Sequence, residues 1–363
     1  MLTLSVIQAE FGDCMLLRFG RTRPRHILID GGPSGTYAKH LRPVLEQVRQ
    51  QADCLDLMIL SHVDNDHIIG LLEMMVHMVD LRGRNQPELL PVRALWHNAF
   101  HRAEGSGAEI GGRLEAGMAG QQGTIFAAAN AVTFGIKEGN KLLLAAQELG
   151  IPVNPDTGGD VITTETLGGA LMMDDLKMWI IGPTPQNLER LEKKWLAWLD
   201  TYENRAPFAD EIETDKIDRS VPNLSSIMLL ARSGRKKILL TGDGTSDDVL
   251  EGLRASNLLN KSGRLHVDVL KLPHHGSARN IRRAFFDTVT AKTYIISANG
   301  KYNNPDLATL IWLVSAAKKQ RRKINILATN QTEAIDQLVE EYPPETHGYQ
   351  MVILPPGEHA LDV

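Results

Sequence analysis

Short apolar runs separated by small polar turns recur along the first hundred residues. Runs at 2–8, 14–19, 26–29 and 57–60 have the length and composition of β-strands. A longer stretch at about 37–51, between the third and fourth runs, predicts a helix. This part of the chain therefore predicts a β-rich half with a helix outside its sheet.

The same order returns after residue 170. Runs at 176–181, 226–231, 237–240 and 267–272 predict strands, and 185–202, 247–255 and 307–317 predict helices. Two β-rich halves, about 1–100 and 170–363, in which strands end in polar loops fit an α/β fold. We expect an αββα four-layer sandwich, in which two mixed sheets face each other and the helices lie outside.

Residues 100–170 interrupt this alternation. The segment begins with Gly-rich sequence at 105–123 and continues with a helical stretch at 124–149. A two-sheet core does not require these elements, so we predict a helical, Gly-rich insertion within a single domain. Its apolar helices make it the candidate surface for a protein partner.

The overall composition is that of an ordinary globular protein. The chain has 363 residues, 43% of them apolar and 23% charged, which is enough to build a sizeable core. It contains no run of 18 apolar residues and no basic leader, so we expect no membrane association. Cys14 and Cys54 are too few for a disulfide framework, which favours a cytoplasmic location. The net charge of −5 argues against a general nucleic-acid coat.

Four metal-binding side chains follow the apolar run at 57–60. His62, Asp64, Asp66 and His67 fall within six positions, and Gly70 closes the motif. A single His beside an Asp is most often a satisfied core residue, but a core has no use for four such groups. A loop that leaves a buried strand can place these imidazoles and carboxylates around one or two divalent ions.

Two later strands also end in candidate ligands. Asp243 follows the run at 237–240 in a Thr-Gly-Asp-Gly sequence, which taken alone is also compatible with an ordinary turn. His274 and His275 follow the run at 267–272 in Pro-His-His-Gly-Ser. Polar side chains at three strand ends therefore indicate one shared site.

The cluster at 62–70 resembles the H-x-[HD]-x-D-H-x-x-G signature of the metallo-β-lactamase superfamily. The resemblance implies a metallohydrolase with the αββα fold and two divalent metal ions. It implies that His62 and Asp64 serve one metal site, that Asp66 and His67 serve the other, and that Asp243 bridges them.

The remaining ligand stays open between neighbouring residues. His275 lies in a P-x-H-G frame like the last ligand of that family and is slightly preferred, whereas His274 is a second ligand or a hydrogen-bond donor to substrate. His97 lies where many relatives have a further His ligand, although a packed His is the commoner alternative.

The ligand set also bears on the metal and the reaction. Asp64 in place of a second His makes the first site richer in oxygen, which shifts its preference from zinc towards manganese, with zinc still an alternative. Two ions that share Asp243 would hold a bridging hydroxide for in-line attack on a phosphate. Asp66, His67 and Asp243 are then the predicted catalytic residues.

A narrower resemblance rests on motifs spread over residues 1–310, apart from the insertion. They are Gly12-Asp-Cys14, Asp30-Gly-Gly32, Asn223-Leu-Ser-Ser226, Thr241-Gly-Asp243 and His274-His-Gly-Ser277. Together they look like the metallo-β-lactamase domain of the ComEC-type DNA-uptake proteins. This implies a phosphodiesterase or nuclease with nucleic acid as substrate. The chain departs from that family at Asn304, where relatives commonly have a His before Pro.

Residues near these motifs are candidates for phosphate contacts: Ser277, Arg279, Asn299 and Lys301. We expect Ser277 to cap a helix that carries Arg282 and Arg283 and presents free N–H groups to an anion. Asp30 is expected to hold the ligand loop or a ligand His instead of the metal itself.

Two other functions stay open. Hydrolysis of a small ester, lactam or phosphorylcholine-type substrate agrees with the lack of a strongly basic chain. An effector subunit that works with a partner protein agrees with the segment 100–170. Cleavage of nucleic acid is preferred because Arg279 and the two arginines after it follow the last metal motif.

Overall fold

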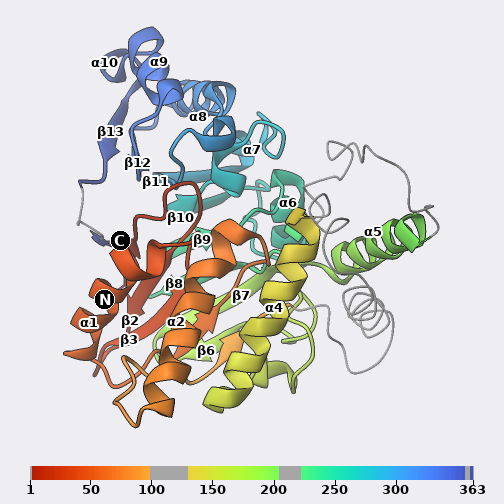
Figure 1. Cartoon of the computed structure of the whole chain (residues 1–363). Coiled ribbons are helices and arrows are strands. Elements are labelled where there is room, and N and C mark those ends of the chain that lie inside the picture. Colours follow the sequence, from red (N-terminus) through yellow and green to blue (C-terminus); the bar gives the residue numbers. More distant parts are fainter. Residues whose placement is uncertain (1, 99–129, 204–221, 356–359, 363) are drawn as a thin grey trace.

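The protein is built from two mixed β-sheets packed face to face, with helices on both outer surfaces (Figure 1). The computed structural model describes residues 2–98, 130–203, 222–355 and 360–362. The two sheets and two helical layers form an αββα sandwich, which confirms the predicted fold class.

The first sheet has six strands in the order β14-β1-β2-β3-β4-β5. Its strands β1 to β3 are antiparallel, whereas β3, β4 and β5 are parallel, so β3 and β4 end at the same edge. The strands are β1 (Thr3–Val6), β2 (Met15–Phe19), β3 (Arg25–Ile29), β4 (Leu57–Ile59), β5 (Leu95–Trp96) and β14 (Ala360–Asp362).

The second sheet has eight strands in the order β13-β12-β11-β10-β9-β8-β7-β6. Strands β6 to β9 are antiparallel and strands β9 to β13 are parallel. The strands are β6 (Leu171–Met173), β7 (Leu176–Gly182), β8 (Met228–Ser233), β9 (Lys236–Leu240), β10 (Leu265–Lys271), β11 (Val289–Ile296), β12 (Ile324–Ala328) and β13 (Tyr349–Ile353).

Alternation along the strands explains why both faces of each sheet are apolar. In β2, Met15, Leu17 and Phe19 belong to the core between the sheets, whereas Leu16 belongs to the core under the outer helices. Successive side chains of a strand point to opposite faces, so one apolar run serves two cores. The same pattern makes the strands read as continuous apolar runs in the sequence.

Helices cover the outer faces of the two sheets. On the first sheet lie a π-helical turn (Tyr37–Leu41), α1 (Arg42–Arg49), α2 (Asn65–Gly83) and α4 (Asn130–Leu149). On the second sheet lie α6 (Ser246–Ala255), α7 (Phe285–Thr288), α8 (Leu307–Lys319) and α9 (Glu333–Glu341). Two further α-helices among the described residues are α5 (Pro185–Glu203) and α10 (Pro344–His347).

Helix α4 lies in the described part of the segment 100–170, which is residues 130–170. It packs beside α2, and Leu142, Ala146 and Leu149 are buried in the same core as the α2 residues. Residues 99–129, including the Gly-rich sequence, lie outside the described residues. The role of this segment as an insertion stays a prediction.

The expected helix start at Ser277 is wrong. Ser277 instead follows a short 3-10 helix (Pro273–Gly276), and the next helix, α7, begins only at Phe285. The backbone of His274 and His275 is left-handed, with φ of 45° and 54°, and this conformation precludes a regular helix there. Residues 279–283 therefore lie in a turn segment.

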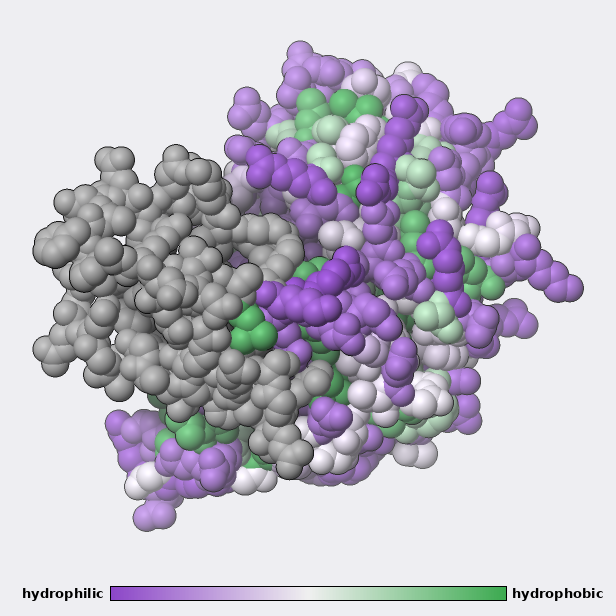
Figure 2. Space-filling model, turned by 90° about the vertical axis from the view of Figure 1, so that its right-hand side faces the viewer, coloured by the Kyte–Doolittle hydropathy of each residue, from purple (hydrophilic) through white to green (hydrophobic). Residues whose placement is uncertain are grey.

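The described part of one face of the molecule is mainly polar. On the side that carries α4, α5 and α6, hydrophilic residues predominate and apolar residues form separate groups (Figure 2). Within the described residues, we find no helix with the length and hydropathy needed to cross a bilayer.

Candidate metal centre

The predicted ligands converge at the edge where strands of both sheets end. Asp30 follows β3, and His62 and His67 follow β4 in the first sheet, while Asp243 follows β9 and His275 follows β10 in the second. Carboxyl ends of parallel strands meet at one edge of a sheet, and ligand-binding loops commonly gather there. The two halves of the chain thus contribute to one centre.

The first ligand motif is the start of a helix. Asp64 is the N-cap of α2 and Asp66 lies in its first turn, where the helix dipole favours negative charge. Gly70 makes this geometry possible because a Cβ at that position would lie 1.9 Å from the carbonyl oxygen of Gly31. Helix α2 can therefore pack directly against the loop after β3 and carry His67 into the interior.

Ring nitrogens from three histidines surround the Asp243 carboxylate. His275 Nε2 lies 3.3 Å from Asp243 Oδ2, His67 Nε2 lies 3.5 Å from Oδ1, and His62 Nε2 lies 3.9 Å from Oδ2. These three nitrogens are buried and have no hydrogen-bond partner among the described residues. Buried polar atoms normally have a partner, so the three lone nitrogens together indicate a cation site.

The opposite nitrogen of two of these rings is held by the protein. His67 Nδ1 lies 2.9 Å from Asp30 Oδ2, and His275 Nδ1 lies 2.8 Å from the carbonyl oxygen of Ser297. When Nδ1 carries the proton and donates it to an oxygen, Nε2 of the neutral ring has a free electron pair that can bind a metal ion. Asp30 also accepts hydrogen bonds from the backbone N–H and the hydroxyl of Ser61, each at 2.7 Å. It thereby fixes both the ligand loop and a ring.

The aspartates of α2 approach the same nitrogens. Asp64 Oδ2 lies 3.6 Å from His62 Nε2. Asp66 Oδ2 lies 3.5 Å from His275 Nε2 and 3.8 Å from His67 Nε2. The side chains therefore fall into two neighbouring groups, one around His62 and one around His67, with Asp243 close to both.

His274 belongs to the first of these groups. Its Nε2 lies 3.7 Å from Asp243 Oδ2, and its side chain is one quarter exposed, unlike the buried His275. Asn223 Nδ2 lies 3.1 Å from His274 Nδ1, while Asn223 Oδ1 is buried without a partner. Turning this amide over would let Oδ1 accept from Nδ1–H and would leave Nε2 free as a ligand atom.

Two residues that the sequence reasoning missed complete the centre. Lys271, at the end of β10, is fully buried, and its Nζ lies 2.5 Å from Asp13 Oδ2 and 3.4 Å from Asp243 Oδ1. Asp13, after β1, approaches His67 and His275 from their Nδ1 sides, at 4.0 and 3.5 Å. Four of these residues can place one ligand atom each within 4.8 Å of one another: Asp13, His67, Asp243 and His275. We place Asp13 behind the rings because its carboxylate is paired with Lys271.

The electrostatics of the cluster follow from its burial and its mixed charge. Burial lowers the pKa of His275, but the charges of Asp243 and Asp13 and a hydrogen bond to Asp243 together outweigh burial and raise that pKa to about 10. The pKa of His67 is likewise raised well above its usual range, because Asp243, Asp30 and Asp66 outweigh burial. Burial raises the pKa of Asp66, but His67 and His275 outweigh burial and lower that pKa to about 2. The Asp66 carboxylate is thus charged at neutral pH and available to a cation.

His97 lies outside this group of contacts. It is buried, and neither ring nitrogen has a hydrogen-bond partner in the part of the chain that the structure describes. Burial lowers its pKa to about 4. A Cβ on Gly139 of α4 would lie 3.5 Å from His97 Nε2, so the ring faces α4. His97 is therefore a buried imidazole beside α4, and its role as a ligand stays a prediction.

The candidate phosphate contacts are divided between two loops. Ser277 is buried beside the His pair, whereas Asn299 and Lys301 lie on the loop after β11. Asn299 donates to Glu10 Oε2 at 3.0 Å, and Lys301 Nζ lies 3.5 Å from the centre of the Phe11 ring.

The arginines after Ser277 differ from one another in pairing. Arg282 Nε lies 2.6 Å from Asp247 Oδ2 in an exposed ion pair. Arg279 and Arg283 are exposed as well. One of the three candidate cations is therefore already engaged by a carboxylate.

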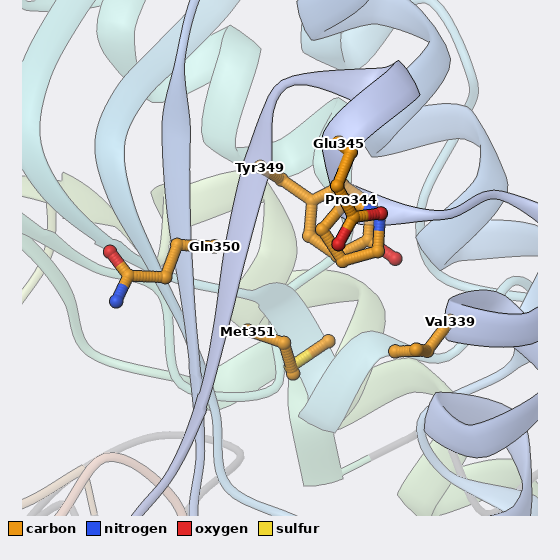
Figure 3. Close-up of a pocket in the computed structure, with 6 residues that line it drawn as sticks. All are labelled: Val339, Pro344, Glu345, Tyr349, Gln350 and Met351. Atoms are coloured by element: carbon orange, nitrogen blue, oxygen red, sulfur yellow. The ribbon is translucent and has the colours of Figure 1, made fainter.

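A surface pocket elsewhere is unrelated to this centre. It lies between α9, α10 and β13, at the far edge of the second sheet (Figure 3). Its lining residues are Val339, Pro344, Glu345, Tyr349, Gln350 and Met351. Strands β12 and β11 separate it from β10, so it does not open onto the metal ligands.

The chain is similar in sequence to known proteins. The family model of the metallo-beta-lactamase superfamily matches residues 8–188. ComE operon protein 3 of Bacillus subtilis (strain 168) is 28% identical over 197 residues, which are 54% of this chain and 19% of that protein. The chain thus matches about a fifth of the length of this relative. With the αββα sandwich and the buried His/Asp centre at its strand ends, this chain belongs to the metallo-β-lactamase superfamily.

Proposed function

We propose that the protein is a phosphodiesterase that cleaves nucleic acid with two divalent metal ions. The observation that carries this proposal is the convergence of three buried, unpartnered Nε2 atoms on one carboxylate, Asp243. Such a donor set of imidazoles and carboxylates suits zinc or manganese. The buried centre and the family both support metallohydrolase chemistry.

The two groups of side chains suggest how the ions would be held. His62, Asp64 and His274 would form one site, and the second would take Asp66, His67 and His275. Asp243 would serve both sites because its carboxylate faces ring nitrogens of both groups. This assignment gives roles to both His274 and His275.

Divalent ions bound there supply positive charge to phosphate oxygens and lower the pKa of a water molecule towards neutrality. The chain contributes the positions of the ligands. Asp30 and Ser297 orient His67 and His275 through Nδ1, and Lys271 holds Asp13 and Asp243 in the buried interior. Because these supports are buried, the ligand geometry exists before substrate arrives.

The nucleic-acid substrate is supported by two lines of reasoning. The motifs resemble those of the DNA-uptake proteins, and ComE operon protein 3 is a similar sequence. In addition, cationic side chains lie on two segments that adjoin the ligand loops, with Arg279 and Arg283 after the His pair and Lys301 on the loop after β11, whose Ser297 contacts His275. Phosphodiesters in a chain can contact such flanking charges, whereas a small ester cannot reach them. The two unpaired cysteines, Cys14 and Cys54, agree with a cytoplasmic location.

The test is a substrate comparison with manganese, magnesium and zinc in parallel. Wild-type protein should cleave bis-p-nitrophenyl phosphate and labelled oligonucleotides but leave nitrocefin intact. His67→Ala should abolish both phosphodiester activities. His266→Ala is the matched control because this exposed imidazole lies on β10 outside the cluster. Hydrolysis of nitrocefin with no action on phosphodiesters would overturn the proposal.

A further inference from the structure

An exposed aromatic and cationic cluster lies on two loops at the rim of the metal centre. Tyr302 is 63% exposed, and its ring packs edge-to-face against Phe11 with centroids 5.8 Å apart. Lys301 Nζ lies 3.5 Å from the Phe11 centroid and 5.0 Å from that of Tyr302. We call these three residues the rim cluster. It presents an ammonium group and an open aromatic ring side by side.

Both loops of the rim cluster are fastened to the metal-ligand loops. A Cβ on Gly12 would lie 1.9 Å from the carbonyl oxygen of Asp66, so Phe11 is next to a residue in direct contact with a predicted ligand. On the other loop, the Ser297 carbonyl faces His275 and the Ser297 hydroxyl donates to the carbonyl of Gly12. The rim cluster is therefore rigidly positioned relative to the centre.

Tyr302 has an unfavourable backbone conformation that its exposed side chain does not stabilise. Tyr302 has φ of 59° and Asn303 has φ of 62°, a left-handed conformation that a bulky residue rarely adopts. Glycine would accept the same backbone without this cost. A large aromatic side chain that is strained and mostly exposed points to a use outside the fold, since strained residues gather at functional sites.

We propose that the rim cluster binds single-stranded nucleic acid, with one unstacked base lying against the Tyr302 ring and the neighbouring phosphate near Lys301. This inference rests on the proposed phosphodiesterase function and names the substrate form. Aromatic rings bind any base through its face, and a nearby ammonium complements the phosphate charge. A base within a duplex is stacked on both sides and cannot use the Tyr302 ring. The cluster therefore selects single strands over duplexes.

The experiment measures cleavage of a single-stranded oligonucleotide and of copies with one abasic nucleotide at each position in turn. For wild-type protein, kcat/KM should fall about tenfold when the missing base is the one that stacks on Tyr302. Tyr302→Leu should cleave the intact strand about tenfold more slowly and should respond equally to every abasic position. Tyr302→Phe should behave like wild type because it keeps the ring.

Two further variants separate this result from a folding defect. Tyr302→Gly relieves the left-handed backbone, so its Tm should equal or exceed that of wild type while its abasic response is lost. Met172→Ala removes another exposed apolar side chain, on β6, and should leave both readouts unchanged.

The outcomes distinguish the two proposals. If wild-type protein cleaves neither bis-p-nitrophenyl phosphate nor oligonucleotides, the proposed function itself fails. If it cleaves single strands but Tyr302→Leu retains the wild-type abasic profile, the rim cluster does not stack a base and this inference is overturned. Equal loss on duplex and single strand in Tyr302→Leu would likewise contradict the stacking role.

Discussion

The Lys271 ammonium lies 2.5 Å from the Asp13 carboxylate in the fully buried interior of the metal centre. The same ammonium lies 3.4 Å from Asp243 and 2.8 Å from the carbonyl oxygen of Gly242, to which it donates. Burial lowers the pKa of Lys271, but Asp13 and Asp243 outweigh burial and raise it. A permanent positive charge therefore stands among the carboxylates of the centre.

Replacing this lysine should destabilise the protein. Lys271→Met keeps the length of the side chain but leaves the Asp13 charge buried without its cation, which should cost about 3–5 kcal/mol in the free energy of unfolding. The double variant Asp13→Asn with Lys271→Met removes both charges and should lose much less. Urea unfolding in chelator measures both. Equal losses in the single and double variants would show that Lys271 contributes packing alone.

Asp243 should control metal content. Its two oxygens face nitrogens from both groups of histidines, so Asp243→Asn should lose most of the bound metal. Elemental analysis after dialysis gives the metal content per chain. Asp247→Asn, an exposed carboxylate at the start of α6, is the matched control. Full metal retention in Asp243→Asn would exclude a bridging role.

Metal binding should release protons. In the metal-free chain, the pKa of His275 is about 10 and that of His67 is raised well above its usual range, so both rings are protonated at pH 7. A ring must lose a proton before Nε2 can bind an ion, so up to about two protons should leave per chain. Calorimetric titration in buffers with different ionisation enthalpies counts them. Release of none would mean that neither ring binds the ion.

His97 should make stability depend on pH in acid. Burial lowers its pKa to about 4 from an ordinary value of 6.5, so the unfolded chain binds a proton that the folded chain excludes. The contribution of His97 to the free energy of unfolding is therefore constant above pH 6.5. It declines as the pH falls from 6.5 to 4, and it is constant again below pH 4. His97→Leu should remove this decline, which amounts to at most about 3 kcal/mol.

The measurement for His97 is the difference between wild-type and His97→Leu unfolding free energies across this pH range. Metal content serves as the control. It should be unchanged, because the ring faces α4 and lies outside the contacts around Asp243. A large loss of metal in His97→Leu would restore His97 as a ligand.

The arginines after the His pair should differ in their effect on nucleic-acid cleavage. Arg282 is already paired with Asp247, so Arg282→Ala should weaken cleavage less than the double replacement Arg279→Ala with Arg283→Ala. The double variant should also reduce the salt dependence of kcat/KM for an oligonucleotide, while turnover of bis-p-nitrophenyl phosphate stays within about twofold. Equal effects on both substrates would indicate a disturbed centre.

Sequence patterns predicted the strands well, because each apolar run has to serve two cores. The run at 14–19 became β2 (Met15–Phe19), and the run at 237–240 became β9 (Lys236–Leu240). The helix expected at Ser277 did not form, since propensity and capping residues carry no information about the left-handed backbone of His274 and His275. That conformation is imposed by contacts between distant segments.

The ligands themselves were easier to find than their supports. Four ligand-type residues in six positions form a local pattern, whereas Lys271 and Asp13 are far apart in the sequence and only the fold brings them together. A charged residue inside the apolar run Val-Leu-Lys-Leu was the available signal, because a buried lysine requires a partner. The contact between Lys301 and Phe11 had no such signal, because it depends on two loops whose shapes the sequence does not specify.

The origin of the ligands in both sheets has a mechanical consequence. His62 and His67 belong to the first sheet, and Asp243 and His275 belong to the second, so any ion bound among them is a cross-link between the two halves. Like a disulfide that closes a long loop, it would restrict the unfolded chain and couple the opening of one half to that of the other. Chelation should therefore let the two sheets separate more readily, and hydrogen exchange should rise first along the core that joins them.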